Sequence, residues 1–263
     1  MAVIDCFTYN GEMKTLQLHL GILDKYVDRF LIVEANKTFS GNDKPLYFFQ
    51  QQQYVKQFWK KIDYYVVNDW DDTDLWEQAI NSPNTKGAKH WKREFYIKES
   101  IHKALKKSHV KDDDTLFIGD VDEIIDPTAE HESDTPIKTK LRVYAYHLNN
   151  LSNEEFHGTL ICQYKDIKDK CLNHVRSDTR LYSKGKFLGW HFTNMGGLEE
   201  IRRKLNDSYT TESYNTYETQ EKLPQRLKEN KDYLGRNFTF TLDETNWPLY
   251  LKENREKFKY LCK

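Results

Sequence analysis

The stretch that decides the fold is TLFIGDVDE, residues 115–123, an apolar run that ends in three acidic side chains. The apolar run predicts a buried strand over Thr115–Gly119. Asp120 and Asp122 follow directly, at the carboxyl end of that strand, which is where open α/β sheets bind their ligands. An acidic turn after a strand is also common without any function. The preceding strand and the third acid, Glu123, favour a functional site.

Further strands and helices are predicted before this stretch. The apolar runs Val3–Phe7, Arg29–Glu34 and Ile62–Val67 read as buried strands. Between them, Met13–Leu23 and Lys89–Lys107 carry apolar stripes with helical spacing. Strands that alternate with helices indicate an α/β fold, with a parallel sheet covered by helices on both faces.

The pattern changes in the second half of the chain. Leu141–Leu148 and Thr159–Tyr164 read as strands without a long helix between them. Helical patterns follow over Leu198–Leu205, Glu218–Asn230 and Pro248–Leu261. We therefore predict one domain over residues 1–263, with a first half up to residue 127 and a second half from residue 128.

Composition excludes several classes of protein. The 263 residues carry 40 Lys and Arg against 41 Asp and Glu, and this balance argues against a nucleic-acid binder. No apolar run approaches the ~18 residues that span a bilayer, so we expect at most peripheral membrane contact. The four cysteines form no zinc-binding pattern and are expected to be reduced thiols, with a Cys162–Cys171 bridge left open.

Two of the motifs offer ligands for a divalent metal. The carboxylate oxygens of Asp120 and Asp122, an Asp-x-Asp pair, suit Mn²⁺ or Mg²⁺, and such an ion bridges to diphosphate oxygens. Gly189-Trp190-His191 supplies an imidazole, which suits Mn²⁺ as well. A core Trp beside a hydrogen-bonded His is the ordinary interpretation of this tripeptide. We predict a metal site formed by Asp120, Asp122 and His191.

Two other segments are candidates for binding a ligand. Residues 34–41 (EANKTFSG) form a polar loop after a buried strand, although Asn, Ser and Gly also serve plain turns. Arg93 could meet phosphate, but arginines on helices more often form surface ion pairs. Gly196-Gly197 lets the backbone approach a ligand before the helix at Leu198. Glu199 lies in its first turn, where a carboxylate also stabilises the helix dipole.

Taken together and in this order, the motifs resemble glycosyltransferase family 17, the family of the bisecting N-acetylglucosaminyltransferase. The stretches that carry the resemblance are Asp28–Leu46, Lys111–Pro127, Gly189–Leu205 and Tyr250–Leu261. The resemblance implies a GT-A type fold, in which a central, mostly parallel sheet flanked by helices is joined to a smaller mixed sheet. Residues 1–127 would bind the nucleotide sugar, and residues 128–263 would form the acceptor side and the C-terminal helices.

The resemblance also implies an activity, which is inverting transfer of GlcNAc from UDP-GlcNAc with Mn²⁺ or Mg²⁺. Asp120 and Asp122 would hold the metal and the diphosphate, with Asp122 counted as catalytic and His191 as third ligand. The family has an acid where Glu199 lies, so Glu199 is the candidate general base, followed by Glu123, Glu155 and Asp178. The UDP-sugar would also contact a set of loop and helix residues: Glu34, Asn36, Thr38, Gly41 and Arg93.

Several questions stay open at this level. The middle of the chain, Leu141–Arg180, departs most from the family, so the acceptor is expected only to be a glycan or a lipid-linked saccharide. The chain lacks the membrane anchor of the animal enzyme, which predicts a bacterial or viral member working in the cytoplasm. A sugar nucleotidyltransferase would use the same sheet and acids on another phosphate. A glycan-binding protein without turnover is the alternative outside enzymology.

Overall fold

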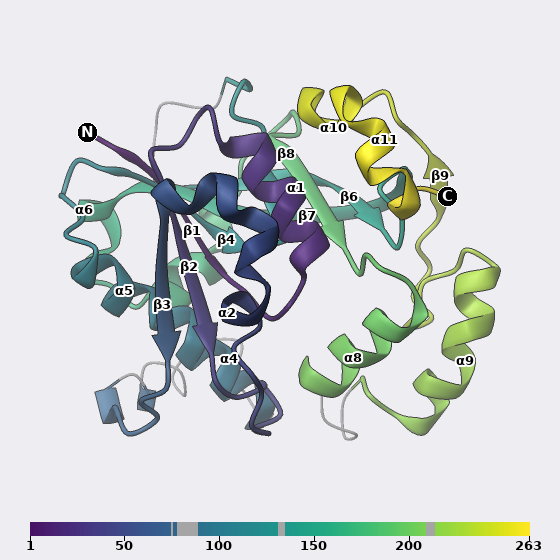
Figure 1. Ribbon diagram of the computed structural model, residues 1–263, viewed down its shortest axis with the longest axis horizontal. Coiled ribbons are helices and arrows are strands. Elements are labelled where there is room, and N and C mark those ends of the chain that lie inside the picture. The colour runs from purple at the N-terminus through teal and green to yellow at the C-terminus, as the bar shows by residue number, and fades with distance from the viewer. Residues whose placement is uncertain (75, 78–88, 131–134, 209–213) are drawn as a thin grey trace.

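The computed structural model describes residues 1–74, 76–77, 89–130, 135–208 and 214–263, and shows helices packed on a nine-stranded sheet (Figure 1). The strands are β1 Val3–Thr8, β2 Arg29–Ala35, β3 Ile62–Val67, β4 Thr115–Asp120, β5 Glu123–Ile125, β6 Ile137–Ala145, β7 Asn150–Gln163, β8 Gly189–Thr193 and β9 Phe240–Leu242. The helices are α1 Met13–Leu23, α2 Tyr47–Gln51, α4 Lys89–Glu99, α5 Ile101–Lys107, α6 Tyr164–Ile167, α7 Leu172–Ser177, α8 Leu198–Ser208, α9 Tyr217–Lys228, α10 Leu249–Glu253 and α11 Arg255–Phe258. Short 3₁₀ helices are η1 Gln52–Lys61, η2 Thr179–Leu181 and η3 Lys259–Leu261.

The predicted strands of the first half form the parallel part of the sheet, in the order β3-β2-β1-β4. Phe7 of β1 lies opposite Ile32 on one side and Gly119 on the other, so the strands end close together at one edge. Side chains of β1 alternate between the two faces, with Ile4 and Cys6 on one and Phe7 on the other. This alternation explains why these strands read as continuous apolar runs, since both faces are covered.

The prediction of a mostly parallel sheet joined to a second, smaller sheet is wrong. One sheet runs through the order β3-β2-β1-β4-β7-β6-β8-β5, with β9 beside β7, and it is mixed. β4 pairs antiparallel with β7, β7 with β6, and β5 with β8, whereas β6 and β8 are parallel. β5 directly follows β4 in the chain, yet three other strands separate the two in the sheet. The sheet therefore curls, which brings β5 back beside the end of β4. Apolar runs show which segments are strands but not which strands pair.

Two of the predicted helices are interrupted. The helix expected over Lys89–Lys107 is divided at Ser100, whose hydroxyl donates to the Tyr96 carbonyl at 2.8 Å. The helix expected over Pro248–Leu261 breaks at Asn254, whose side-chain amide donates to the Tyr250 carbonyl at 2.9 Å. Polar side chains that bond the backbone in this way compete with regular helix.

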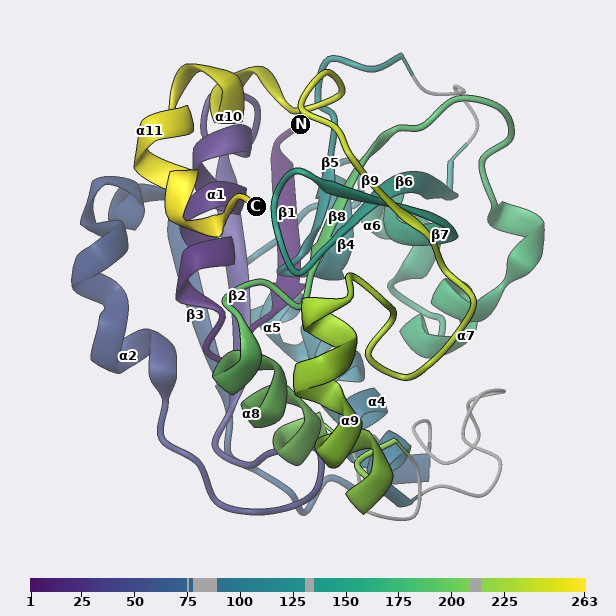
Figure 2. The same ribbon diagram turned by 90° about the vertical axis from the view of Figure 1, so that its right-hand side faces the viewer.

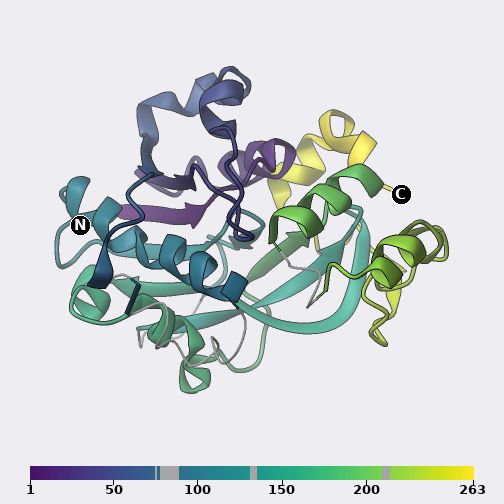
Figure 3. The same cartoon turned by 90° about the horizontal axis from the view of Figure 1, so that it is seen from below.

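Apolar clusters fix the helices on both faces of the sheet (Figure 3). One cluster joins α1, η1, α10 and α11 to the sheet through residues such as Leu16, Phe58 and Phe258. Figure 2 shows α10 and α11 along α1. The opposite cluster contains α4, α5 and α7. None of the described helices is long and apolar enough to cross a membrane, and all four cysteines are free.

A third cluster holds the helical pair α8–α9 beyond the ends of β6 and β8 (Figure 1). Ile201 and Leu205 of α8 pack with Leu223 of α9 and with Tyr146, which follows β6. This packing directs the opposite side of α8 toward the carboxyl end of β4, so that Lys204 reaches the acidic loop. The second half of the chain therefore completes the site that β4 begins.

Candidate active site

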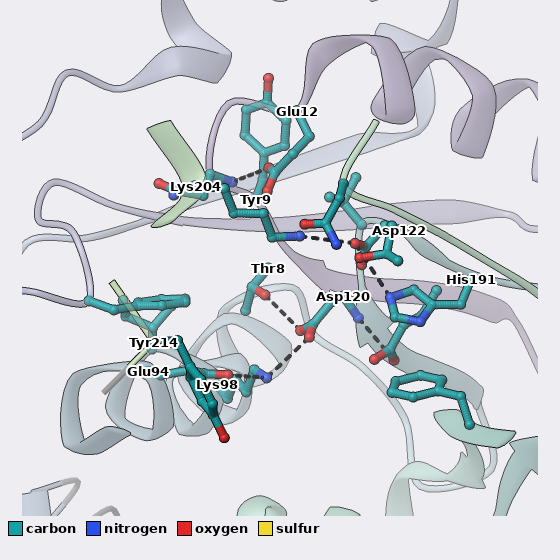
Figure 4. Close-up of a pocket in the computed structure, with 18 of the residues that line it drawn as sticks. Thr8, Tyr9, Glu12, Glu94, Lys98, Asp120, Asp122, His191, Lys204 and Tyr214 are labelled. Carbon is teal, nitrogen blue, oxygen red and sulfur yellow. Dashed lines mark hydrogen bonds and ion pairs between the residues drawn. The ribbon is translucent and has the colours of Figure 1, made fainter. Parts of the chain in front are cut away.

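The acidic loop between β4 and β5 forms backbone hydrogen bonds with the Glu123 side chain and with β8. Val121 is buried, and therefore Asp120 and Asp122, on either side of it, both turn toward one cavity (Figure 4). The backbone N–H of Asp120 donates to Glu123 Oε2 at 3.3 Å, and the carbonyl of Asp122 accepts from Phe192 N at 2.9 Å. The i, i+2 spacing thus places two carboxylates on one wall of the cavity.

The cavity has a volume of about 400 Å³ and lies between the two halves of the chain. Such a volume is within the range of ordinary ligand pockets, roughly 300–1,000 Å³. From the first half it is lined by Thr8, Tyr9, Glu12, Ala35, Lys37, Phe39, Lys44, Glu94, Ile97 and Lys98. From the second half it is lined by Glu154, Phe156, His191, Lys204, Tyr214, Tyr233 and Arg236. Both polar groups and aromatic rings are therefore available to one ligand.

Asp120 is ionised by the cations around it. Its Oδ2 accepts from Lys98 Nζ at 3.1 Å, its Oδ1 accepts from Thr8 Oγ1 at 3.0 Å, and Arg176 lies 3.8 Å away. Burial acts to raise the pKa of Asp120, but the charges of Lys98 and Arg176 outweigh it and hold that pKa at about 2. The Asp120 carboxylate is therefore negative at neutral pH.

Asp122 is ionised in the same way from the other side. Lys204 Nζ lies 3.2 Å and His191 Nε2 lies 3.5 Å from its Oδ2. Burial again opposes ionisation, but Lys204 and His191 together hold the pKa of Asp122 far below its usual range. Each acid of the pair is thus balanced by a lysine from a different helix, Lys98 from α4 and Lys204 from α8.

His191 and Glu123 are shifted toward their protonated forms. They lie opposite each other on β8 and β5. Burial lowers the pKa of His191, but Asp122 and then Glu123 raise it, and the net change is upward. For Glu123, burial and the neighbouring Asp120 raise the pKa against the pull of Arg176. A buried carboxyl with a raised pKa is suited to proton transfer.

Apart from Asp120, the residues predicted to contact the donor lie beside the cavity rather than in its wall. Ala35, Lys37 and Phe39 line it, whereas Glu34, Asn36 and Thr38 do not. Every second side chain from Ala35 to Phe39 therefore lines the cavity, although the chain leaves β2 at Ala35 and turns at Phe39–Ser40. The loop containing these residues borders the cavity, and the sequence did not single out the residues of the loop that line it.

The excluded residues have other contacts. The carboxylate of Glu34 is fully buried and accepts from Tyr47 N at 2.7 Å and Lys44 Nζ at 3.0 Å, so it fixes the start of α2. Asn36 accepts from the Trp70 indole at 2.8 Å. Gly41 has φ +100°, and an added Cβ would lie 2.6 Å from the guanidinium carbon of Arg93. These residues shape the loop that borders the cavity.

The structure does not bring Glu199 to the cavity. Its side chain is 84% exposed and pairs with Arg202 at 3.0 Å in the first turn of α8. Of the other candidate bases, Glu155 pairs with Lys140 and Asp178 pairs with Arg180, both outside the cavity wall. Glu123 lines the cavity. Of the four carboxylates considered as the general base, Glu123 alone lines the cavity, so its position fits that role better than that of Glu199.

Some of the site residues gave no signal in the sequence. Lys98 and Lys204 read as ordinary charged positions on helices, because their contacts with the acids join segments far apart in the chain. Arg176 is buried in α7, with Nε and Nη1 lacking hydrogen-bond partners among the described residues, and lies behind Asp120 and Glu123. Glu154 lines the cavity, whereas the predicted candidate next to it, Glu155, does not, because adjacent side chains of β7 point to opposite faces of the sheet.

Comparison with known proteins bears on this site. The family model of glycosyltransferase family 17 matches residues 1–213, which include the acidic loop, β8 and α8. No curated protein and no solved structure matches the chain. The match ends before Tyr250–Leu261, so that part of the predicted resemblance stays a prediction. Since the match covers most of the chain, the enzyme is a glycosyltransferase and belongs to glycosyltransferase family 17.

Proposed function

We propose that this glycosyltransferase transfers GlcNAc from UDP-GlcNAc, with inversion, to a hydroxyl group of a glycan or lipid-linked saccharide. The observation that carries the proposal is the pair of ionised carboxylates, Asp120 and Asp122, on the wall of a cavity shared by both halves of the chain. Family membership supports sugar transfer over the nucleotidyltransferase and binding-protein alternatives.

The residues present fit a divalent metal that binds together with the donor. Among the described residues, no group of three or more His, Cys, Asp or Glu side chains is arranged to hold an ion alone. Mg²⁺ commonly uses one or two carboxylates and takes the rest of its shell from water and substrate phosphates. Asp120 and Asp122 supply such carboxylates. When bound, Mn²⁺ or Mg²⁺ would offset the charge that develops on the leaving diphosphate.

His191 fits this metal site less directly. Its Nε2 faces Asp122, and its raised pKa favours the imidazolium, which pairs with a carboxylate but cannot ligate a metal. Metal binding through His191 would therefore have to release that proton. As an imidazolium, His191 instead orients Asp122. The role of third ligand remains part of the proposal, and a substitution at His191 tests it.

Glu123 is the proposed general base. It lines the cavity, and its raised pKa suits removal of a proton from the attacking hydroxyl as the anomeric bond forms. The negative wall of Asp120 and Asp122 lies next to it, where the diphosphate leaves. Lys98 and Lys204 also line this region. Once Asp120 and Asp122 bind the metal, the two lysines can pair with the phosphate oxygens of the donor.

Donor binding tests this proposal without an acceptor. UDP-GlcNAc should raise the melting temperature in the presence of Mn²⁺ and much less in its absence, because a ligand stabilises the native state according to its affinity. The protein should also hydrolyse UDP-GlcNAc slowly, and Asp120→Asn should remove both effects. A stabilisation by other UDP-sugars but not by UDP-GlcNAc would reject the donor. Pyrophosphate release from UTP and GlcNAc-1-phosphate would identify a nucleotidyltransferase.

A further inference from the structure

The segment formed by α2 and η1 exposes three aromatic rings. Phe49 is 67% exposed, Tyr54 57% and Trp59 51%. Figures 2 and 3 show this segment (blue) as an outer part of the molecule, on the side of the sheet that carries α1. Apolar rings grouped on one surface commonly mark a site of interaction.

These rings are not needed to build the core. Phe48, Val55 and Phe58 of the same segment are buried and supply its apolar contacts with the rest of the fold. Phe49 and Tyr54 lie between Phe48 and Val55 in the sequence, and Trp59 directly follows Phe58. The Trp59 indole donates to the Gln52 carbonyl at 3.2 Å. The Tyr54 carbonyl accepts from Gln17 of α1 at 3.1 Å. The segment therefore buries one set of apolar side chains and exposes these three rings.

The charges on this segment are of one sign. Residues 44–62 contain four lysines and neither Asp nor Glu. Lys56 and Lys60 are exposed beside the rings. Trp and Tyr rings combined with lysines are typical of surfaces that lie in the interface of a membrane, where lysines attract anionic lipids.

We propose that Phe49, Tyr54, Trp59, Lys56 and Lys60, together the aromatic–lysine surface, dock on a bilayer that contains anionic lipids. A second copy of the chain is a poorer occupant, because a symmetric contact would bring the same lysines against each other. Docking would hold the protein at the membrane by the side that carries α2 and η1. The inference does not rest on the proposed donor or acceptor.

Co-sedimentation of the full chain with vesicles tests this inference. The protein should bind vesicles of phosphatidylcholine with phosphatidylglycerol, bind phosphatidylcholine alone far more weakly, and be released by high salt. Lys56→Gln with Lys60→Gln should weaken binding about 25-fold, from roughly fivefold for each lysine. Phe49→Ser, Tyr54→Ser and Trp59→Ser together should abolish it. Tyr217→Ser, which removes an exposed ring on α9, is the matched control and should bind like the wild type.

The outcomes separate this inference from the donor assignment. Failure of the wild type to bind anionic vesicles at low salt would overturn the docking surface, and so would equal binding by both variants with unchanged melting temperatures. A dimer that the aromatic variant abolishes would assign the surface to a second copy instead. Vesicle binding without a donor-induced rise in melting temperature would leave the docking surface standing and remove the donor.

Discussion

His19 Nε2 lies 2.6 Å from Asp5 Oδ2, and both side chains are buried beneath the acidic loop. The other ring nitrogen, Nδ1, lies 2.8 Å from the carbonyl of Val121, between the two acids of the site. The Val121 carbonyl can only accept a hydrogen bond, so Nδ1 donates to it, and Nε2 pairs with the Asp5 carboxyl group. Burial opposes a positive charge on the ring, but Asp5 and the hydrogen bonds raise the pKa of His19 above its usual value.

This relationship predicts how stability changes with pH. A group whose pKa is raised on folding contributes fully below its unfolded pKa, about 6.5 for His. The contribution is lost as the pH rises through the higher folded pKa. His19→Gln should therefore cost the most unfolding free energy below pH ~6.5 and progressively less above it. Urea unfolding of both proteins across this range measures the difference. A difference independent of pH would show that His19 is neutral in the fold.

The lysine beside Asp122 should oppose the binding of metal in the absence of donor. Lys204→Met removes the cation that contacts Asp122, and Mn²⁺ should then bind the donor-free protein more tightly. Asp122→Asn should change affinity in the opposite direction, because a charged ligand is lost. Titration of free Mn²⁺ by electron paramagnetic resonance measures both variants. Unchanged Mn²⁺ affinity in both would place the metal elsewhere.

His191 is tested by the same titration. If it serves as the third ligand, His191→Ala should weaken Mn²⁺ binding in the presence of donor, though less than Asp122→Asn, since both carboxylates remain. If it only orients Asp122 as an imidazolium, Mn²⁺ affinity should change little while the melting temperature falls. His191→Gln, which keeps a hydrogen-bond donor toward Asp122, should then restore the melting temperature.

Substitution of three glutamates tests the assignment of the general base. Glu123→Gln should lower kcat by ~10²–10⁴ with unchanged donor affinity, as expected for loss of a general base. Glu199→Gln should leave kcat near that of the wild type, because its side chain points to solvent. Glu154→Gln is the control for a carboxylate that lines the cavity. A general base must be ionised, and the pKa of Glu123 is raised. As the pH is lowered, the rate should therefore begin to fall at a higher pH than it would for a Glu of ordinary pKa. A large loss in Glu154→Gln with an active Glu123→Gln would reverse the assignment.

Two residues of the loop that borders the cavity should respond differently to substitution. Phe39→Ala should raise the donor KM, since Phe39 lines the cavity. Asn36→Ala should mainly lower the melting temperature, because its side chain bonds Trp70. Steady-state kinetics and thermal unfolding of both variants measure this contrast. An increase in donor KM for Asn36→Ala alone would mean that the loop rearranges when the donor binds.

The sequence by itself determined the parallel strands, the position of the Asp-x-Asp pair and the family. These features depend on the local spacing of apolar and acidic residues. An apolar strand that ends in acidic residues can be recognised without knowing which strands pair with it. The position of Asp120 and Asp122 at the end of β4 follows from this alone.

Only the tertiary structure decided which side chains meet those acids. Lys98 and Lys204 approach from α4 and α8, and their contacts span 22 and 82 positions of the chain, beyond the reach of any local pattern. The pairing of β4 with β7 made the sheet mixed, and it could not be read from apolar runs that suit either strand direction. Glu199 looked suitable for catalysis from its place at a helix start, but the packing of Ile201 and Leu205 sets the rotation of α8. That rotation turns Glu199 to solvent and Lys204 to the site.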